Sequence, residues 1–415
     1  MKSSLNDNFC SSPWFHIRIN PNGDFTPCRW DCSIPDSTYN IKTTSLKVYM
    51  NSEVMRNLRM TLLNGLESKV CTSCRNEDQY NKVSGRQRQL LKSVIDVSNF
   101  DKTFCASPHW DNFEYSYNNQ GKTECLPVDL QIDLGNTCNS GCVICLPTYS
   151  SKLATDYIKL QKIEPELFDS PIPRESWTND PKLVDKFVNE LATIPNIRYI
   201  HFLGGETLYL KSFYDICNRL IDLDLAKDIS IGTTTNCTIY TPELENVLKE
   251  FKHAHLGLSI ESLHPINDYV RWPSKVQTVK TNIERFLELR KTTDLQLSLR
   301  ITPSALSVYH IDTLFEFMLD NEVIAESCNL LVQPSCLRIE LLPKEIIDVV
   351  LAKIDRVIKK YNLVNPNDAL TNRRNESIRS QVISKVIFEY KHTIENLNQP
   401  EDLEQERYNL VKFIK

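Results

Sequence analysis

Segments typical of strands alternate with segments typical of helices through residues 128–345, and this alternation constrains the fold more than any other feature. The strand candidates are short, rich in β-branched residues or leucine, and bounded by turn signals. They are Val128–Leu134, Ile197–Leu203, Asp228–Thr233, His255–Ile260, Leu295–Ile301 and Asn329–Gln333. Six strands joined by helices predict an α/β fold with a parallel sheet and right-handed crossovers. Because a closed barrel has eight strands, we expect an open, partial (β/α)6 barrel of the TIM type.

Three closely spaced cysteines follow the first of these strands. Cys138, Cys142 and Cys145 have the spacing C-x3-C-x2-C, and no fourth cysteine lies nearby. A purely structural metal site normally has all its positions filled by protein ligands. Three thiolates can hold three irons of a four-iron cluster and leave the fourth iron open for a substrate or cofactor. The cysteine loop also follows a strand, and barrel active sites lie at the carboxyl ends of strands.

Composition favours metal ligation in a reducing compartment. Fourteen of the 415 residues are cysteine, which in the cytoplasm favours metal ligands or scattered buried thiols over a disulfide framework. The formal net charge of −5 does not indicate a nucleic-acid or anionic-membrane surface. The first residues lack the apolar core of a signal peptide, and no apolar run is long enough to span a bilayer. We therefore expect a cytoplasmic protein with no nucleic-acid partner and no membrane partner.

Glycine is scarce, with 10 residues in the chain. Six of them lie between positions 128 and 260: Gly135, Gly141, Gly204, Gly205, Gly232 and Gly257. We expect each of these to mark a backbone that bends tightly or approaches a ligand closely.

The cysteine loop resembles the cluster-binding loop of the radical S-adenosylmethionine (AdoMet) superfamily. The preceding strand and Asn139, directly after the first cysteine, fit this resemblance, whereas Ile144 stands where many members have an aromatic residue. The resemblance implies that Cys138, Cys142 and Cys145 hold a catalytic [4Fe–4S] cluster to which S-adenosylmethionine binds.

The segment Phe202-Leu-Gly-Gly-Glu-Thr207, at the end of the second strand candidate, fits the same family. Two glycines let the backbone approach a ligand, and exposed carbonyls with a carboxylate accept hydrogen bonds from an ammonium group. By resemblance, Gly204, Gly205 and Glu206 bind the methionine amino group of the cofactor.

Further cofactor contacts are implied after later strands. Ser259 and Glu261 end the fourth strand candidate and, by resemblance, lie near the ribose and carboxylate of S-adenosylmethionine. Arg271 is a candidate partner of that carboxylate, since guanidinium pairs with carboxylate bidentately. Asn236 and Gln333 follow the third and sixth strands, where relatives place a ribose contact and an adenine contact. Each motif alone has an ordinary structural explanation, and their order along the chain supports the cofactor site.

A second cysteine set lies near the N-terminus. It consists of Cys10-Ser-Ser-Pro-Trp14, Gly23-x4-Cys28 and Cys71-Thr-Ser-Cys74. The set resembles one half of a SPASM domain, the reduced form usually called twitch, which adds an auxiliary cluster to radical enzymes. Cys10, Cys28, Cys71 and Cys74 would saturate one auxiliary [4Fe–4S] cluster, in a module that here precedes the barrel although it follows it in most relatives. A structural zinc site is the alternative, since a C-x2-C pair with two further cysteines is also common around zinc.

Four regions are expected along the chain. They are a twitch-like cysteine-rich module in 1–90, a connection in 91–127, the radical AdoMet core in 128–345 and a C-terminal helical extension in 346–415. Within the first region, Trp14–Ile19 and Gly23–Thr26 predict a small hairpin around a strong turn sequence.

Seven further cysteines have no ligand spacing: Cys32, Cys105, Cys125, Cys217, Cys237, Cys328 and Cys336. Most are expected to be small buried hydrophobes. Cys32 is an alternative ligand to Cys28, and Cys105 or Cys125 could donate a hydrogen atom.

The resemblance implies an enzyme that cleaves S-adenosylmethionine to a 5′-deoxyadenosyl radical, which takes a hydrogen atom from the substrate. The auxiliary cluster would handle electrons, and a small donor such as flavodoxin or ferredoxin would supply them. Modification of a peptide or protein side chain is favoured because SPASM-type relatives mostly do this, although residues 1–90 show no leader-binding winged-helix module. Oxidation of a small molecule, such as a sugar or nucleotide derivative, is the alternative. A non-catalytic metal-binding scaffold is a third possibility, against which the intact Gly204-Gly205-Glu206 argues.

Overall fold

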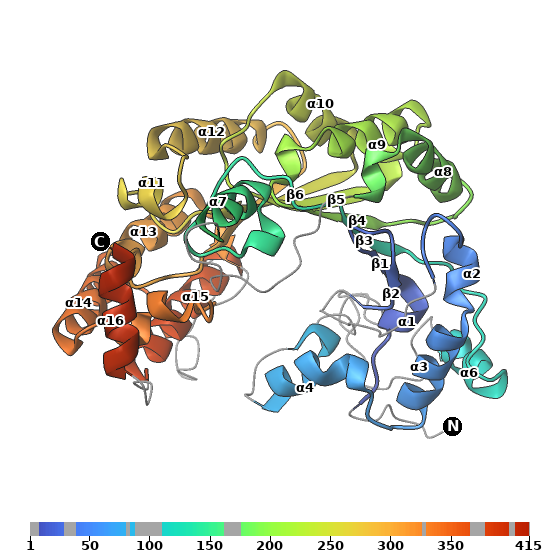
Figure 1. Ribbon diagram of the computed structural model, residues 1–415, viewed down its shortest axis with the longest axis horizontal. Helices are drawn as coiled ribbons and strands as arrows, with labels where there is room; N and C mark the ends of the chain where they lie inside the picture. The colour runs from blue at the N-terminus through green and yellow to red at the C-terminus, as the bar shows by residue number, and fades with distance from the viewer. Residues whose placement is uncertain are drawn as a thin grey trace.

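One curved sheet of eight strands runs through the middle of the chain, in the order β2-β1-β3-β4-β5-β6-β7-β8 (Figure 1). The computed structural model describes residues 8–28, 39–79, 84–87, 110–161, 176–325, 329–365, 378–397 and 403–414. The strands are β1 His16–Ile19, β2 Phe25–Thr26, β3 Asp129–Asp133, β4 Tyr199–Leu203, β5 Ser230–Thr235, β6 His253–Ser259, β7 Leu295–Arg300 and β8 Ile324–Ala325. Neighbours from β1 to β8 pair in parallel, and β2 is antiparallel to β1. The expected open, partial barrel is therefore confirmed.

Five of the predicted strands are confirmed as β3 to β7, with small shifts at their ends. The sixth prediction, Asn329–Gln333, is wrong, because this segment is irregular and exposes Val332 and Gln333. The last strand is instead β8, which pairs with Ser298 and Leu299 of β7. Two residues are too few to produce a strand pattern in the sequence, so β8 could not be recognised.

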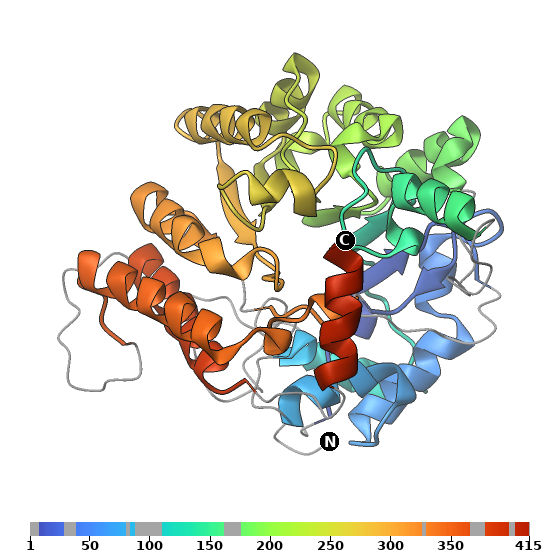
Figure 2. The same ribbon diagram turned by 60° about the vertical axis from the view of Figure 1, so that its left-hand side comes forward.

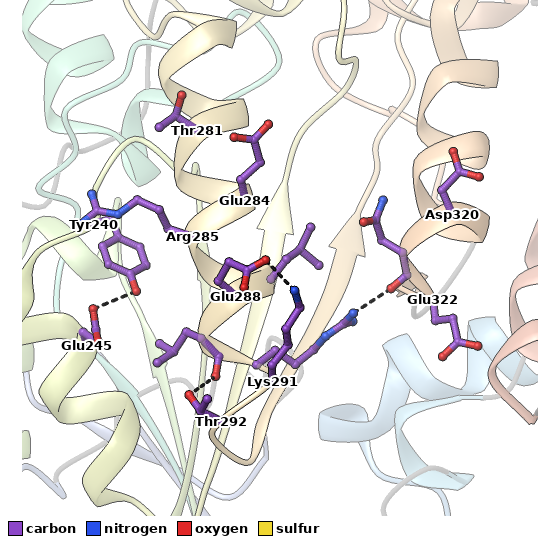
Figure 3. A pocket seen from close by; sticks show the side chains of 14 residues that line it. Tyr240, Glu245, Thr281, Glu284, Arg285, Glu288, Lys291, Thr292, Asp320 and Glu322 are labelled. Atoms are coloured by element: carbon purple, nitrogen blue, oxygen red, sulfur yellow. Dashed lines mark hydrogen bonds and ion pairs between the residues drawn. The ribbon is translucent and has the colours of Figure 1, made fainter.

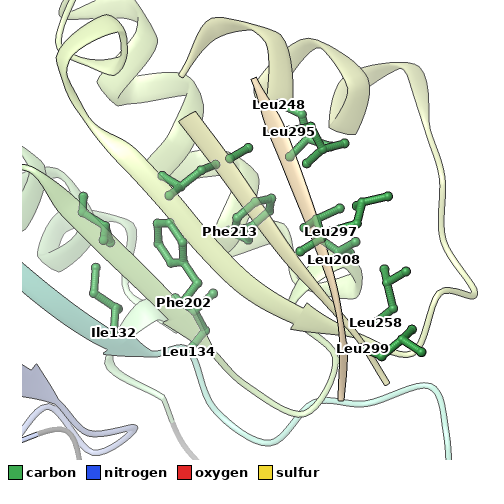
Figure 4. Packing of buried hydrophobic residues seen from close by; sticks show 14 of the residues in the cluster. Ile132, Leu134, Phe202, Leu208, Phe213, Leu248, Leu258, Leu295, Leu297 and Leu299 are labelled. Atoms are coloured by element: carbon green, nitrogen blue, oxygen red, sulfur yellow. The ribbon is translucent and has the colours of Figure 1, made fainter. Parts of the chain in front are cut away.

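Helices cover the convex face of the sheet (Figure 2). They are α8 Pro181–Leu191, α9 Lys211–Asp222, α10 Pro242–Glu250, α12 Val276–Leu289 and α13 Ile311–Asn321, with the short α11 Ile266–Val270 before α12. Asp180 caps α8, since its side chain accepts a hydrogen bond from the Lys182 N–H at 3.0 Å. Strand residues on this face, including Ile132, Phe202 and Leu297, pack with the helices into one apolar core (Figure 4).

The concave face of the sheet carries mainly polar side chains, because side chains alternate between the two faces of a strand. Tyr199 Oη lies 3.1 Å from His201 Nδ1 on β4, and His255 Nε2 of β6 lies 2.8 Å from Ser298 Oγ of β7. Arg18 of β1 reaches Asp133 of β3 at 3.5 Å. Closed barrels instead fill their interior with branched apolar side chains.

Two glycines make room for these polar groups. A Cβ added at Gly232 would lie 2.0 Å from Tyr199 Oη, and one added at Gly257 would lie 2.9 Å from Arg300 Nε. Neither glycine has a left-handed backbone conformation. These two glycines therefore do not mark a left-handed turn, and the missing side chain leaves space for a neighbouring strand's side chain.

The N-terminal module is joined to the barrel through the predicted hairpin. β1 and β2 pair antiparallel around a turn in which Gly23 has a φ of +93°. β1 also pairs in parallel with β3, with Ile17 opposite Leu130, so the hairpin extends the barrel sheet. The helices of this module are α1 Ser12–Phe15, α2 Leu46–Met50, α3 Glu53–Leu63 and α4 Thr72–Gln79, and α6 Trp110–Asn118 packs against α3.

A buried arginine holds this module together. The Arg59 side chain of α3 has no exposed surface and donates to the backbone carbonyls of Pro13, Met50 and Gly121 at 2.6–3.0 Å. Burial lowers the pKa of Arg59 to about 10, so the side chain stays charged near neutral pH. One guanidinium therefore satisfies carbonyls from three separate segments.

The C-terminal helices are part of the same core. They are α14 Lys344–Lys360, α15 Ile378–Glu395 and α16 Leu403–Ile414. Buried side chains of α14 and α15, such as Ile354 and Ile387, belong to the apolar cluster that covers the sheet. Tyr390 of α15 donates from Oη to the Ile301 carbonyl and accepts from the Asn329 N–H, both at 3.1 Å. In the described ranges, none of the helices combines the length and apolar character that crossing a bilayer needs.

We expect Tyr390→Phe to lower the free energy of unfolding by about 1–3 kcal/mol, because it leaves a buried carbonyl and a part-buried N–H without their partner. Urea denaturation of the purified protein measures this change. Tyr408→Phe is the matched control, since Tyr408 is 63% exposed, and it should leave the midpoint unchanged. Equal midpoints for Tyr390→Phe and wild type would show that the tyrosine bridge contributes nothing.

Candidate active site and auxiliary cysteine site

The cysteine loop runs from the end of β3 to α7 Ser151–Gln161 and is held by hydrogen bonds to its own backbone. The Cys138 N–H donates to Ser151 Oγ at 3.1 Å, and the Ser140 N–H donates to the Cys138 sulfur at 3.4 Å. Ser150 Oγ donates to the Ser140 carbonyl at 2.7 Å. These contacts fold the loop back on the first turn of α7.

The three cysteines line a single cavity of about 260 Å³ at the carboxyl ends of the strands. Six other predicted site residues line it with them: Gly204, Gly205, Glu206, Asn236, Ser259 and Arg271. The structure thus brings together residues from the ends of β3, β4, β5 and β6 that are far apart in the sequence.

Two predicted cofactor residues do not line this cavity. Glu261 lies behind Arg271, and Gln333 is exposed because the strand expected to end there does not form. Ile144, noted in the cysteine loop, and Thr235, next to Asn236, also line it, together with residues that were not selected from the sequence: Ser140, Tyr149, Ser150, Thr234 and Thr302. Of these, Thr302 had a usable signal, since it directly follows the predicted strand Leu295–Ile301.

The Gly-Gly-Glu turn lies directly against the cysteine loop. The Gly205 N–H donates to the Gly135 carbonyl at 2.9 Å, and the Glu206 N–H donates to the Thr137 carbonyl at 3.0 Å. A Cβ added at Gly205 would lie 2.5 Å from the carbonyl oxygens of Asn136 and Thr137. Glycine is therefore required here by the close approach of two backbones.

Glu206 is a buried carboxylate in the wall of the cavity, only 2% exposed. Its Oε2 accepts from the Asn236 N–H at 2.7 Å, and its Oε1 accepts from the Leu208 N–H at 3.3 Å. Burial raises the pKa of Glu206 to about 7, although these hydrogen bonds oppose the rise. A cationic ligand group beside it would stabilise the ionised form, which fits the ammonium group of S-adenosylmethionine.

Asn236 contacts the cysteine loop from the end of β5. Its Nδ2 donates to Asn139 Oδ1 at 2.8 Å and to Ser140 Oγ at 3.0 Å. Asn139 in turn donates to Thr238 Oγ1 at 2.9 Å. Both asparagines therefore fix the loop between Cys138 and Cys142.

The chemistry of the donor set fits an iron–sulfur cluster. Burial raises the pKa of Cys138 to about 11 and that of Cys145 to about 12, and it also raises the pKa of Cys142. The cluster-free thiols are thus protonated near neutral pH, and metal binding must displace their protons. In the described part of the chain, no three His, Cys, Asp or Glu side chains converge as ligands of one metal ion. Ligands of a [4Fe–4S] cube bind separate irons around the cube and need not converge on one point.

The structure also gathers the four N-terminal cysteines. Burial raises the pKa of Cys10 well above its usual range, and Cys28, Cys71 and Cys74 add to this rise. Burial and then Cys28 raise the pKa values of Cys71 and Cys74 to about 11. Cys10 and Cys71 pack against the apolar face of α3. Thiols from three distant segments therefore lie near enough to raise one another's pKa values.

The remaining cysteines lie elsewhere. Cys125 packs in the aromatic cluster around Phe9 and Phe113 and does not line the cavity, which speaks against the alternative role of a hydrogen-atom donor. Cys217 and Cys237 are fully buried, as expected. Cys32, Cys105 and Cys328 lie outside the described residues.

A larger hollow of about 980 Å³ lies along the outside of α12 (Figure 3). Its charged side chains largely satisfy one another: Lys291 Nζ lies 2.6 Å from Glu288 Oε1, and Tyr240 Oη donates to Glu245 at 3.1 Å. It contains no cysteine and no predicted site residue, so its size does not make it the candidate active site.

Comparison with known families agrees with this geometry. The sequence model of the Radical SAM superfamily matches residues 132–300, and that of SPASM, an iron–sulfur cluster-binding domain, matches residues 10–75. The chain therefore contains a radical SAM domain, of a kind found in an enzyme superfamily, preceded by a SPASM domain. Its cofactors are a [4Fe–4S] cluster, S-adenosylmethionine and auxiliary iron–sulfur clusters. The SPASM match thus favours an iron–sulfur cluster over structural zinc at the N-terminal cysteines.

The solved structures that match the chain share little sequence with it. anSMEcpe with bound AdoMet is 16% identical, with a TM-score of 0.39, over 57% of this chain and 62% of that one. SuiB of Streptococcus suis bound to S-adenosylmethionine is 12% identical, with a TM-score of 0.35, over 86% of this chain and 70% of that one. The structure of SuiB bound to precursor peptide SuiA is 12% identical, with a TM-score of 0.37, over 82% of this chain and 77% of that one. The chain thus spans less than two thirds of anSMEcpe. No curated protein matches the sequence.

We expect the cluster-free protein to lose stability relative to Glu206→Gln as the pH rises. The folded pKa of about 7 lies above the ordinary value of 4.5, so the contribution of Glu206 is present at low pH and lost through about pH 7. This loss amounts to about 2 kcal/mol between about pH 5 and pH 8. Urea denaturation of both proteins across this range measures it. Any stability that Glu206→Gln loses with the carboxylate hydrogen bonds is the same at every pH. Parallel plots of unfolding free energy against pH for the two proteins would therefore contradict the raised pKa.

Proposed function

We propose that this chain is a radical AdoMet enzyme that abstracts a hydrogen atom from a peptide or protein side chain. Cys138, Cys142 and Cys145 would ligate the AdoMet-binding cluster. The observation that carries this assignment is one cavity at the strand ends, lined by these three cysteines and by the Gly-Gly-Glu turn. When bound and reduced, the cluster supplies the electron that splits S-adenosylmethionine into methionine and a 5′-deoxyadenosyl radical.

The chain's own residues bind and orient the cofactor. Glu206 and the backbone of Gly204 and Gly205 accept hydrogen bonds from the cofactor's amino group, since the buried carboxylate gains a cationic partner. Ser259 and Thr302, which also line the cavity, offer hydroxyl groups to the nucleoside part. Ile144 and Tyr149 line the same cavity as the three cysteines, and their apolar surfaces would limit access of water.

Cys10, Cys28, Cys71 and Cys74 would ligate the auxiliary cluster. Cys28 follows β2, whose last residue Thr26 lies opposite Arg18, so this site is at the amino end of β1. The cysteine loop follows the carboxyl end of the neighbouring β3, and a strand of five residues spans about 17 Å. A substrate over the concave face would lie between the two sites. This supports a role for the auxiliary cluster in accepting an electron from the substrate radical, with a flavodoxin or ferredoxin as the external donor.

The polar concave face supports a polar substrate. His201, His255, Ser298 and Arg300 are polar residues of this face, and Gly232 and Gly257 leave the space that the Tyr199 and Arg300 side chains occupy. A peptide backbone offers one donor and one acceptor per residue to such a face. Relatives with a SPASM-type domain mostly modify peptides or proteins. This favours a peptide substrate over a small sugar or nucleotide derivative.

Two cysteine variants separate the clusters. Anaerobic Cys142→Ala should lose about four irons and all 5′-deoxyadenosine formation with dithionite, because one ligand of the open cluster is missing. Cys71→Ala should lose about four irons and still form 5′-deoxyadenosine. Cys217→Ala, in the core, is the control and should keep the full iron content. Retained cofactor cleavage in Cys142→Ala would remove the catalytic assignment, and full iron in Cys71→Ala would remove the auxiliary one.

Isotope transfer identifies the substrate class. The holoenzyme is incubated with uniformly deuterated cell extract, separated into a peptide and protein fraction and a low-molecular-weight fraction. We expect deuterium in 5′-deoxyadenosine, measured by mass spectrometry, with the first fraction alone. Deuterium from the second fraction alone would instead establish the small-molecule alternative.

A further inference from the structure

Arg271 and Glu261 contact each other and the cysteine loop, although the sequence predicted both as cofactor contacts. Arg271 Nε and Nη2 donate to the two carboxylate oxygens of Glu261, the second at 2.8 Å. The Glu261 side chain has no exposed surface, and that of Arg271 is 12% exposed. Two of the guanidinium nitrogens are therefore engaged in a bidentate ion pair that is shielded from water.

The third guanidinium nitrogen is directed to a cysteine. Arg271 Nη1 donates to the Cys142 sulfur at 3.8 Å. The planar guanidinium carries five N–H donors in a fixed geometry, so it can bind Glu261 with one edge and Cys142 with another. A lysine has a single ammonium group and could not make both contacts in this geometry.

The backbone fixes these two residues opposite each other. The Gly141 N–H donates to the Trp272 carbonyl at 2.8 Å, and the Val143 N–H donates to the Val270 carbonyl at 2.9 Å. Cys142 lies between the two donors, Gly141 and Val143. Arg271 lies between the two acceptors, Val270 and Trp272. The short segment after α11 is thus paired with the cysteine loop. This pairing keeps the backbone of Arg271 next to that of Cys142.

A third contact reinforces this pairing from α7. Lys152 Nζ lies 4.1 Å from the ring centroid of Trp272, a distance typical of a cation–π contact. The loop, α7 and the segment after α11 therefore hold one another in place around Cys142.

We propose that Arg271 is a positioning residue that donates a hydrogen bond to the Cys142 ligand and so raises the reduction potential of the AdoMet-binding cluster. Glu261 sets the orientation of the guanidinium. Hydrogen bonds and positive charge at a cluster sulfur stabilise the more negative, reduced state. This inference rests on the proposed function, because it requires Cys142 to be a cluster ligand.

The test is a redox titration of the anaerobic holoenzyme without S-adenosylmethionine, followed by electron paramagnetic resonance. The main variant is Arg271→Met combined with Glu261→Gln, which removes the hydrogen bond and leaves no buried charge without a partner. We expect its midpoint potential to shift to a more negative value and its iron to be lost to a chelator faster. Arg271→Lys should show a smaller shift in the same direction.

Arg290→Met is the matched control, since Arg290 is a part-buried arginine that donates to the Asn321 carbonyl at 2.9 Å, just after α12. It should leave the potential unchanged. An unchanged potential in the double variant, with weaker S-adenosylmethionine binding alone, would overturn the inference and leave the proposed function intact. A wild-type protein whose spectrum does not respond to S-adenosylmethionine would overturn both.

Discussion

The parallel pairing of β1 with β3 is the contact on which the rest of this arrangement depends. It places a strand of the N-terminal module in the same sheet as the barrel, with Ile17 opposite Leu130 and Ile19 opposite Ile132. The module is therefore joined to the barrel by a shared hydrogen-bonded edge as well as by its connecting chain. The positions of the two cysteine sets relative to each other follow from this register.

The candidate active site depends on close contact between backbones. The Gly-Gly-Glu turn lies against the cysteine loop through two backbone hydrogen bonds, and the segment after α11 is paired with the same loop through two more. Side chains then complete the site, with Glu206 on one side of the loop and Arg271 on the other. Few flexible side chains are needed to hold the loop, which suits a site that must bind a cluster and a cofactor in one orientation.

Much of this could be predicted from the sequence because the signals are local. Five strands are rich in leucine or β-branched residues, Asp180 and Pro181 mark a helix start, and the cysteine spacings point to cluster chemistry. Long-range partners left no local signal. The pairing of β1 with β3 joins residues more than a hundred positions apart, and the contact of Arg271 with Cys142 joins residues 129 positions apart. The packing role of Gly232 and Gly257 could not be predicted for the same reason, since the side chains they make room for lie on other strands.

The order of the two domains also has a consequence for synthesis of the chain on the ribosome. All four auxiliary cysteines are translated before β3 exists, whereas β1 stays without its parallel partner until residue 129 has emerged. During this interval the hairpin exposes a strand edge that other chains can pair with. Expression conditions that slow translation through residues 80–130 therefore lengthen the period in which nascent chains can aggregate.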